Sequence, residues 1–305
     1  MVKTTTKIIL LACCILLSAC GNQGNGQNHN SVPADSGNPI MPDTKTAEPV
    51  TPQEQEAPPA AVDKESSGTA GGTKVRGTAD EQASEQPAAD EKPELKYHMN
   101  KVYRIVPNDE SVPSKVVLLT FDDGPKDADM INRLIDTLDK HQAKAIFFVN
   151  GYRVKANPEL LSIIHDRGQI IGNHAWDHID LKQESQAKVR QQIEDVQQIV
   201  KDTIGTEPAF FRPPFGSGGD AVKDIASEND LLYMTWSNGS LDWESKNKNK
   251  PEAVINNVLE QLHPGSNILM HELPWTVEAL DDLLTKLEAK GYGFVDPRAI
   301  EPQIR

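Results

Sequence analysis

Two adjacent carboxylates, Asp122 and Asp123, end a short apolar run and precede Gly124–Pro125, a pair that forces a turn. Neighbouring like charges are unfavourable unless a positive group offsets them, and a metal ion would do so. Residues 174–178 (His-Ala-Trp-Asp-His) place two histidines four residues apart, so both imidazoles could face one side of a helical turn. Alone, these patterns also fit a helix-capping turn and solvent-facing histidines. Together they predict a metal site with positions left open for water and substrate.

Three later segments carry further residues that could take part in catalysis or binding. Arg212 ends an apolar run and could hold a carboxylate bidentately, and the backbone N–H groups beyond the two prolines that follow could bind an oxyanion. Asp242 stands beside Trp243, and a tryptophan ring can stack on the apolar face of a sugar. His271 ends another apolar run, where it could act as a general acid. Each segment alone also fits a structural role: a rigid turn, a helix cap beside a core tryptophan, or a hydrogen-bonded histidine.

These residues follow short apolar runs that alternate with amphipathic segments. Such runs are typical of buried parallel strands, and catalytic residues of parallel α/β folds gather at the carboxyl ends of the strands. We expect seven strands, at 116–121, 145–149, 169–172, 209–211, 231–236, 267–270 and 292–295. Helices are predicted at 129–141, 158–166, 183–204, 251–262 and 275–289. The pattern fits a doubly wound sheet or an incomplete (β/α) barrel.

The order of these motifs resembles that of the NodB-type polysaccharide deacetylases, carbohydrate esterase family four. The likeness covers about residues 115–296, with motifs at Thr120–Pro125, His174–His178, Arg212–Gly216, Asp242–Trp243 and Leu269–His271. It implies an α/β fold, a distorted (β/α) barrel of about seven parallel strands. It also implies a hydrolase that removes acetyl groups from amino-sugar polymers.

The resemblance assigns a metal and a base. Asp123, His174 and His178 would bind a divalent metal, usually zinc. Asp122 would be the general base for the attacking water, with Arg212 orienting it.

The remaining roles concern the acyl group and the leaving amine. The backbone N–H of Phe215 would help to hold the oxyanion, and His271 would protonate the amine while Asp242 tunes it. Trp243 and Leu269 would shape the acetyl pocket.

The chain departs from the family pattern in three places. Phe215 stands where Tyr is common, which is tolerated if only its N–H acts. Gly239 replaces a frequent acidic residue, and Glu272 follows His271 where Asp is usual. The departures at Gly239 and Glu272 leave the substrate preference open, but they do not affect the predicted metal site.

The start of the chain resembles an export signal. All three cysteines lie within the first 20 residues, so the rest of the chain has no disulfide framework and no thiolate metal ligand. An apolar run, Ile8–Leu17, ends in Leu17-Ser18-Ala19-Cys20, which resembles a bacterial lipobox. We expect a signal peptide at 1–19, lipidation of Cys20, and anchoring on the extracytoplasmic face of the cell membrane. An ordinary signal peptide cleaved after Ala19 is the alternative.

The chain of 305 residues then divides by composition. Residues 20–95 are rich in Pro, Ala, Glu and Gly, and carry five basic and thirteen acidic residues between 21 and 95, which predicts a disordered spacer. Residues 96–114 form a lead-in that could add a small strand or cap, and residues 115–305 form the deacetylase domain. The net charge of −14 argues against nucleic-acid binding, and we expect a monomer.

The leading functional prediction is metal-dependent deacetylation of peptidoglycan N-acetylglucosamine. Chitin oligomers, an exopolysaccharide and acetyl xylan remain open as substrates. A non-catalytic wall-binding lipoprotein on the same fold is the alternative from another class.

Overall fold

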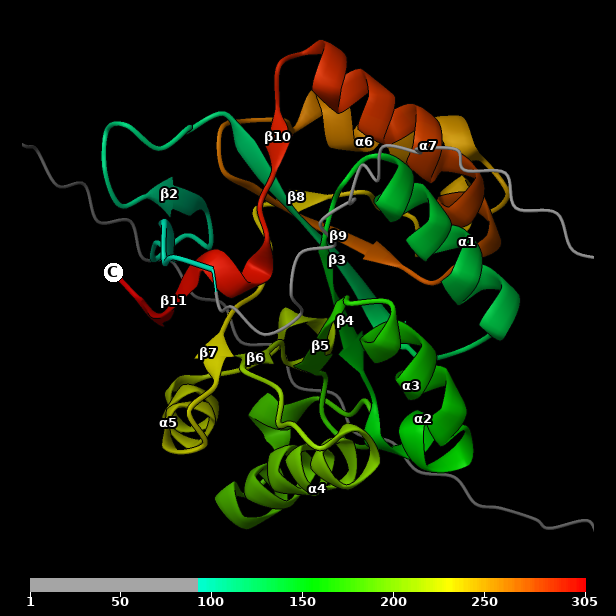
Figure 1. The fold of residues 1–305 in the computed structure, drawn as a ribbon. Coiled ribbons are helices and arrows are strands. Elements are labelled where there is room, and N and C mark those ends of the chain that lie inside the picture. The colour runs from blue at the N-terminus through cyan, green and yellow to red at the C-terminus, as the bar shows by residue number, and fades with distance from the viewer. Residues whose placement is uncertain (1–92) are drawn as a thin grey trace, which may run out of the picture. The chain divides into compact units, whose positions relative to one another are not determined.

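The computed structural model describes residues 93–305 (Figure 1). The predicted signal peptide, the lipidation site Cys20 and nearly all of the spacer lie outside the described residues. Among residues 93–305, no helix is long and apolar enough to cross a membrane.

The core of the fold is a parallel sheet in the order β7-β6-β5-β4-β3-β9-β8, with β10 beside the start of β3. Its strands are β3 (Val116–Gly124), β4 (Ala145–Val149), β5 (Ile170–Asn173), β6 (Phe210–Phe211), β7 (Leu232–Tyr233), β8 (Asn238–Gly239), β9 (Ser266–His271) and β10 (Gly293–Phe294). All of the paired strands in this sheet run parallel, which makes it the distorted, incomplete (β/α) barrel that was expected. Each of the seven predicted apolar runs contains a strand, so that prediction is confirmed.

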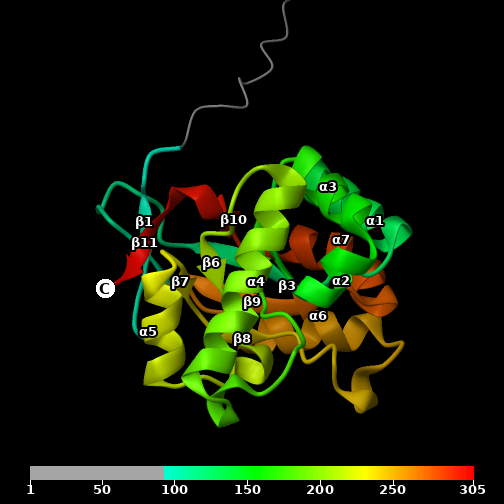
Figure 2. The same cartoon turned by 90° about the horizontal axis from the view of Figure 1, so that it is seen from below.

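Helices cover the outside of this sheet, as Figures 1 and 2 show. They are α1 (Ala128–Lys140), α2 (Gly151–Ala156), α3 (Pro158–Asp166), α4 (Gln186–Ile204), α5 (Asp220–Glu228), α6 (Pro251–Glu260) and α7 (Pro274–Ala289). Helix α1 is representative: Asp127 caps it by accepting a hydrogen bond from the Met130 N–H, and its buried face lies against the core.

Some helix boundaries differ from the predictions for local reasons. Helix α4 begins at Gln186 rather than at 183, because Ser185 accepts a hydrogen bond from the Lys188 N–H and so ends the preceding turn. It stops where Gly205 adopts a φ of 79°, which glycine does without strain. The short helices α2 and α5 were missed, since neither begins with a proline of the kind that marks the similarly short α3.

A second, three-stranded sheet closes the amino ends of the central strands. It pairs β1 (Tyr97–Met99) and β2 (Ile105–Pro107), both from the lead-in, with β11 (Ile300–Ile304) in the order β11-β1-β2. The Ile105 N–H donates to the carbonyl of Gly265, just before β9. A side chain at 265 would approach the Ile105 carbonyl oxygen to 2.0 Å, so only glycine fits there. The carboxyl ends of the strands remain free to carry the site.

Candidate active site

Strand β3 delivers the two carboxylates to the carboxyl edge of the sheet. Asp122 is 3% exposed and lies in register with His271 of the neighbouring strand β9. The next residue, Asp123, has a φ of 65°, so the backbone leaves the extended conformation there. The register alone therefore places the predicted base and the predicted acid on adjacent strands at the same edge.

Asp123, His174 and His178 form a cluster able to hold a metal ion. One ligand atom from each residue lies within 4.8 Å of the other two. Asp123 Oδ1 is 3.4 Å from His174 Nε2 and 3.0 Å from His178 Nε2. Burial opposes ionisation of Asp123, but the two histidines outweigh it and hold the pKa of that carboxyl well below its usual range.

These distances suit a tetrahedral cation. Ligand atoms about 2.1 Å from a tetrahedral zinc lie about 3.4 Å from one another. Asp123 Oδ1 is also buried without a hydrogen bond, a state that a bound cation would correct. The residues present therefore fit a zinc-like divalent ion, with two nitrogens and one oxygen as ligands and the remaining positions open.

The conformation of the histidine segment differs from the prediction. Residues 174–178 form no helical turn, because Ala175 and His178 adopt positive φ values of 62° and 54°. The two imidazoles meet through this loop geometry, with ring centroids 5.1 Å apart. The spacing predicted that the two imidazoles lie close together, which the structure shows, but the helical turn expected to bring them together is absent.

Buried amide side chains hold this loop in place. Asn150 donates to the carbonyls of His174 and Ala175, and Asn173 accepts from the Ala175 N–H. Gln192 of α4 exchanges two hydrogen bonds of 2.8 Å with Asp177, one through the Asp177 N–H and one through its carboxylate. Such fixed partners orient metal-binding residues before the ion arrives.

Arg212 links the metal cluster to the base. Its carbonyl oxygen is 2.7 Å from His174 Nδ1, an arrangement that protonates Nδ1 and leaves Nε2 free to bind metal. Its Nη1 donates to Asp122 Oδ1 at 2.7 Å and to Thr120 Oγ1 at 2.8 Å. The bidentate pairing expected with a carboxylate is therefore wrong, because Nη2 donates to the carbonyl of Thr235 instead.

Complete burial makes this Arg212–Asp122 pair unusual. The arginine is 0% exposed and its guanidinium lies 4.5 Å from the centroid of the Phe148 ring. Burial lowers the pKa of Arg212, and Asp122 acts in the opposite direction. The pair fixes the Asp122 carboxylate beside the metal cluster, where Oδ2 lies 3.7 Å from His174 Nε2.

His271 forms the second buried pair, with Asp242. Its Nδ1 lies 2.7 Å from Asp242 Oδ1, and its backbone N–H donates to Asp242 Oδ2 at 2.7 Å. Thr276 donates to the same Oδ2. Burial opposes protonation of His271, but Asp242 outweighs it, and the pKa of the imidazole is raised above its usual value. This favours the protonated form that a general acid needs.

A pocket of about 200 Å³ lies where these groups meet. It is lined by Asp123, Lys126, Trp243, His271, Leu273 and Trp275. The Trp243 ring packs edge-on to His271 with centroids 5.3 Å apart and is 42% exposed. Leu269, assigned to the acetyl pocket by resemblance, is 3% exposed within β9, and Leu273 lines this pocket instead.

Phe215 borders the metal cluster from the other side. Its ring is 65% exposed and packs edge-on to His178 at 4.6 Å between centroids. Its φ of 60° follows the two prolines. Among the hydrogen bonds of residues 93–305, none uses the Phe215 N–H, which suits the predicted role of oxyanion donor.

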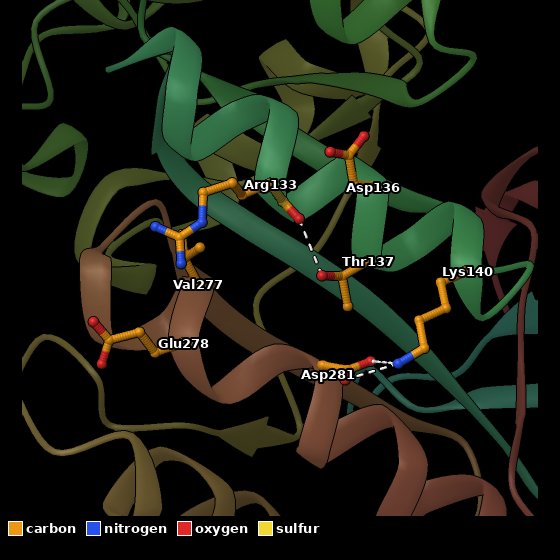
Figure 3. Close-up of a pocket in the computed structure, with 7 residues that line it drawn as sticks. All are labelled: Arg133, Asp136, Thr137, Lys140, Val277, Glu278 and Asp281. Atoms are coloured by element: carbon orange, nitrogen blue, oxygen red, sulfur yellow. Dashed lines mark hydrogen bonds and ion pairs between the residues drawn. The ribbon is translucent and has the colours of Figure 1, made fainter.

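A larger pocket of about 540 Å³ lies between α1 and α7 (Figure 3). It is lined by Arg133, Asp136, Thr137, Lys140, Val277, Glu278 and Asp281. These residues are mostly exposed, and the cluster that could hold a metal is elsewhere. The smaller pocket at the strand ends is therefore the candidate active site.

Comparison with known proteins identifies the family of this chain. The sequence model for polysaccharide deacetylases matches residues 109–234. A peptidoglycan-N-acetylmuramic acid deacetylase of Bacillus subtilis is 32% identical over 63% of this chain and 74% of its own length. The chain belongs to the polysaccharide deacetylase family.

Other members of the family include both a named deacetylase and a pseudoenzyme. A peptidoglycan-N-acetylglucosamine deacetylase of Bacillus cereus is 34% identical over 59% of this chain and 66% of its own. A Bacillus anthracis structure described as a family pseudoenzyme is 30% identical, with a TM-score of 0.58, over 63% of this chain and 67% of that one. The chain spans half or less of two further Bacillus subtilis relatives, 50% and 41%.

Glu272 and Lys126, to which the sequence assigned no role, lie beside this candidate site. Glu272 is 1% exposed and its Oε2 accepts the Lys126 N–H at 2.8 Å. Burial raises the pKa of Glu272 to about 7, although Lys126 opposes the shift. A side chain at 124 would approach Glu272 Oε1 to 2.0 Å, which explains Gly124. Only the position of Gly124 before a proline hinted at this packing.

Proposed function

We propose that this chain is a metal-dependent deacetylase that hydrolyses N-acetyl groups of peptidoglycan amino sugars. The observation that supports it best is the convergence of one metal cluster, one buried base and one buried acid on a single edge of the sheet. Asp122 and His271 are register partners on adjacent strands. Asp123 follows Asp122 in the sequence and lines the same pocket as His271. Base and acid thus flank the place where an acetamido group would meet the ion.

The residues of the chain divide the reaction between them. When bound, a divalent metal would polarise the acetamido carbonyl and make a water molecule more acidic. Asp122, held by Arg212, takes a proton from the attacking water. The Phe215 N–H donates to the oxygen that becomes negative, and His271 gives a proton to the departing amine. Asp242 keeps the imidazole oriented through Nδ1.

Acetate release from purified peptidoglycan is the direct test. We expect turnover that a chelator abolishes and zinc restores. Asp123→Ala should lose both activity and bound metal measured by elemental analysis, and Gln198→Ala, a change on the exposed part of α4, serves as the matched control. Turnover that survives both the chelator and Asp123→Ala would contradict the metal mechanism.

The sugar is the finer part of the proposal. The motifs lead to N-acetylglucosamine as the expected substrate, and relatives named for N-acetylglucosamine and for N-acetylmuramic acid match at similar identity. A panel that adds chitin oligomers and acetyl xylan separates these substrates. The pseudoenzyme relative keeps the non-catalytic alternative open, and glycan binding without acetate release would favour it.

We also propose that the mature protein is a lipoprotein anchored on the outer face of the cell membrane. The support is Leu17–Cys20 after a charged and apolar start. Residues 21–95 would then let the domain reach the wall. Incorporation of a clickable fatty acid that Cys20→Ala abolishes would support the anchor, and a label unaffected by that change would refute it.

A further inference from the structure

Glu272 is a buried carboxyl group to which the proposed reaction gives no step. It directly follows His271 at the end of β9 and is 1% exposed. Its Oε2 accepts a hydrogen bond from the Lys126 N–H at 2.8 Å, whereas its buried Oε1 has no hydrogen-bond partner among residues 93–305. Burying a carboxyl group costs free energy, so the position of this one points to a contribution to the site that offsets the cost.

The segment that Glu272 contacts is the turn that follows Asp123. A side chain at Gly124 would come within 2.0 Å of Glu272 Oε1, so the carboxyl group packs directly against the backbone there. The N–H that Glu272 accepts belongs to Lys126, two residues further along the chain. Glu272 therefore bridges the end of β9 and the turn 124–126, which begins directly after the proposed metal ligand.

Asp123 has a backbone conformation that depends on support from its surroundings. Its φ of 65° lies in the left-handed region, which residues other than glycine adopt at a cost and keep where neighbouring structure holds them. The Asn150 N–H donates to the Gly124 carbonyl at 2.9 Å, and Glu272 accepts the Lys126 N–H. These two hydrogen bonds hold the backbone that directs Asp123 Oδ1 toward the two histidines of the metal cluster.

The charges near Glu272 do not explain its position. Lys126 Nζ pairs with Asp123 Oδ2 at 4.0 Å, and among residues 93–305 neither Lys126 Nζ nor Arg153 forms an ion pair with Glu272. Burial raises the pKa of Glu272 to about 7, although Lys126 and Arg153 oppose the shift. An ionised and a neutral carboxyl group can both accept the Lys126 N–H. The acceptor oxygen, rather than the charge, is thus what the turn uses.

We propose that Glu272 is a positioning residue that holds the turn after Asp123 in the conformation that binds the metal. This inference rests on the metal site of the proposed function and adds to it a residue that does not line the pocket. Partners of this kind orient metal ligands before the ion arrives, and their loss typically lowers metal affinity by about 10–100-fold.

Two variants of similar length separate the acceptor from the charge. Both remove the negative charge, but Glu272→Gln keeps an oxygen that can accept the Lys126 N–H, and Glu272→Met has only a weakly accepting sulfur. The measurement is the Zn²⁺ dissociation constant of the full chain, by competition with a chromogenic chelator. We expect it to be about tenfold or more higher in Glu272→Met than in Glu272→Gln. Glu278→Met, on the exposed face of α7, is the matched control and should leave it unchanged.

Amide hydrogen exchange adds a test that needs no variant. In the wild type, the Lys126 N–H should exchange slowly because Glu272 accepts it. Its exchange should become faster in Glu272→Met and stay slow in Glu272→Gln. Thermal unfolding of each variant checks that the fold is intact.

The outcomes separate this role from the proposed function. Equal weakening of zinc binding in Glu272→Gln and Glu272→Met would overturn the role, because the charge would then be what matters. Unchanged zinc binding in both variants, or fast exchange of the Lys126 N–H in the wild type, would overturn it as well. Zinc binding that depends on Glu272 as expected, without acetate release from peptidoglycan, would overturn the deacetylase function and leave the role of Glu272 intact.

Discussion

Two regions of the molecule bring carboxylates, cations and a histidine together at similar distances. At the strand ends, Arg212 meets Asp122 and His271 meets Asp242, both at 2.7 Å. In the α1–α7 groove, which is the larger pocket of Figure 3, Asp281 lies 2.6 Å from Lys140 Nζ. The same carboxylate lies 2.9 Å from Nε2 of His141, the residue that follows α1. Distances alone would rank the two regions as equals.

Burial of the carboxylates separates the two regions, whereas the histidine side chains are largely buried in both, His271 being 13% and His141 6% exposed. Asp122 and Asp242 are 3% and 0% exposed, whereas the Asp281 side chain is 51% exposed. In water a close ion pair gains little, and exposed pairs contribute about 0–1 kcal/mol. In a buried ion pair each charge depends on its partner, because no water is present to replace it. Removing one member therefore leaves the other as a buried charge without a partner. The comparison teaches that the carboxylates Asp122 and Asp242 are held by buried partners that fix their position, whereas the groove carboxylate Asp281 is screened by water.

The largest effect should come from the base at the strand ends. Asp122→Asn keeps the shape of the side chain but cannot accept the proton of water, so kcat should fall by about 10³-fold, within the range for general-base catalysis. Initial rates of acetate release measure it. Asn in place of the groove carboxylate Asp281 is the matched control. A loss below tenfold in Asp122→Asn would place the base elsewhere.

The second-largest effect, a loss of stability, should come from removing the buried cation Arg212. Arg212→Met leaves Asp122 ionised and buried without its partner, so the free energy of unfolding should fall by about 3–5 kcal/mol. Arg133→Met is the matched control, since the Arg133 side chain in the groove is 52% exposed. This change should lower the free energy of unfolding by less than about 1 kcal/mol. Urea unfolding followed by circular dichroism compares them. Equal losses would mean that burial does not distinguish the two regions.

The His271–Asp242 pair predicts a change in pH dependence. The acid must be protonated, so activity falls as pH rises through the pKa of His271, and Asp242 raises that pKa. Asp242→Asn should therefore move the alkaline limb of kcat to lower pH, so that the variant loses activity at a pH where the wild type is still active. A pH–rate profile records this. An unmoved alkaline limb would exclude His271 as the titrating acid.

The sequence predicted much of the strand-end region because its motifs are local. Asp122, Asp123 and His271 each end an apolar run, and the register of β3 with β9 follows from those runs. The fold class and the grouping of Asp123, His174 and His178 were thus accessible from pattern and resemblance. Strand β8 was not, since Asn238–Gly239 is polar, short and buried only by its neighbours.

The supporting contacts could not be predicted because they join distant segments. Thr120 donates to the carbonyl of Ile268 in β9, and Asn267 contacts Arg212 from 55 residues away. Thr276 reaches Asp242 only once α7 has packed. The conformation at Ala175 was equally hidden, since nothing in its residue type suggests a positive φ. Tertiary packing, rather than local preference, decides these positions.

The smallest effect is expected in the groove, from Asp281→Asn. Lys140 and His141 lower the pKa of Asp281, so its ion pairs stabilise the fold at neutral pH and lose that contribution as pH falls through the folded-state pKa. Exposure screens the interaction, so the variant should lose less than about 1 kcal/mol at neutral pH, and still less in high salt. Its difference from wild type should vanish in acid, where both chains carry a neutral group at 281. Acetate release should be unchanged. Urea unfolding at neutral and acidic pH measures this loss in the free energy of unfolding. A loss comparable to that of Arg212→Met would show that the exposed ion pairs of Asp281 stabilise the fold as much as the buried Arg212–Asp122 pair.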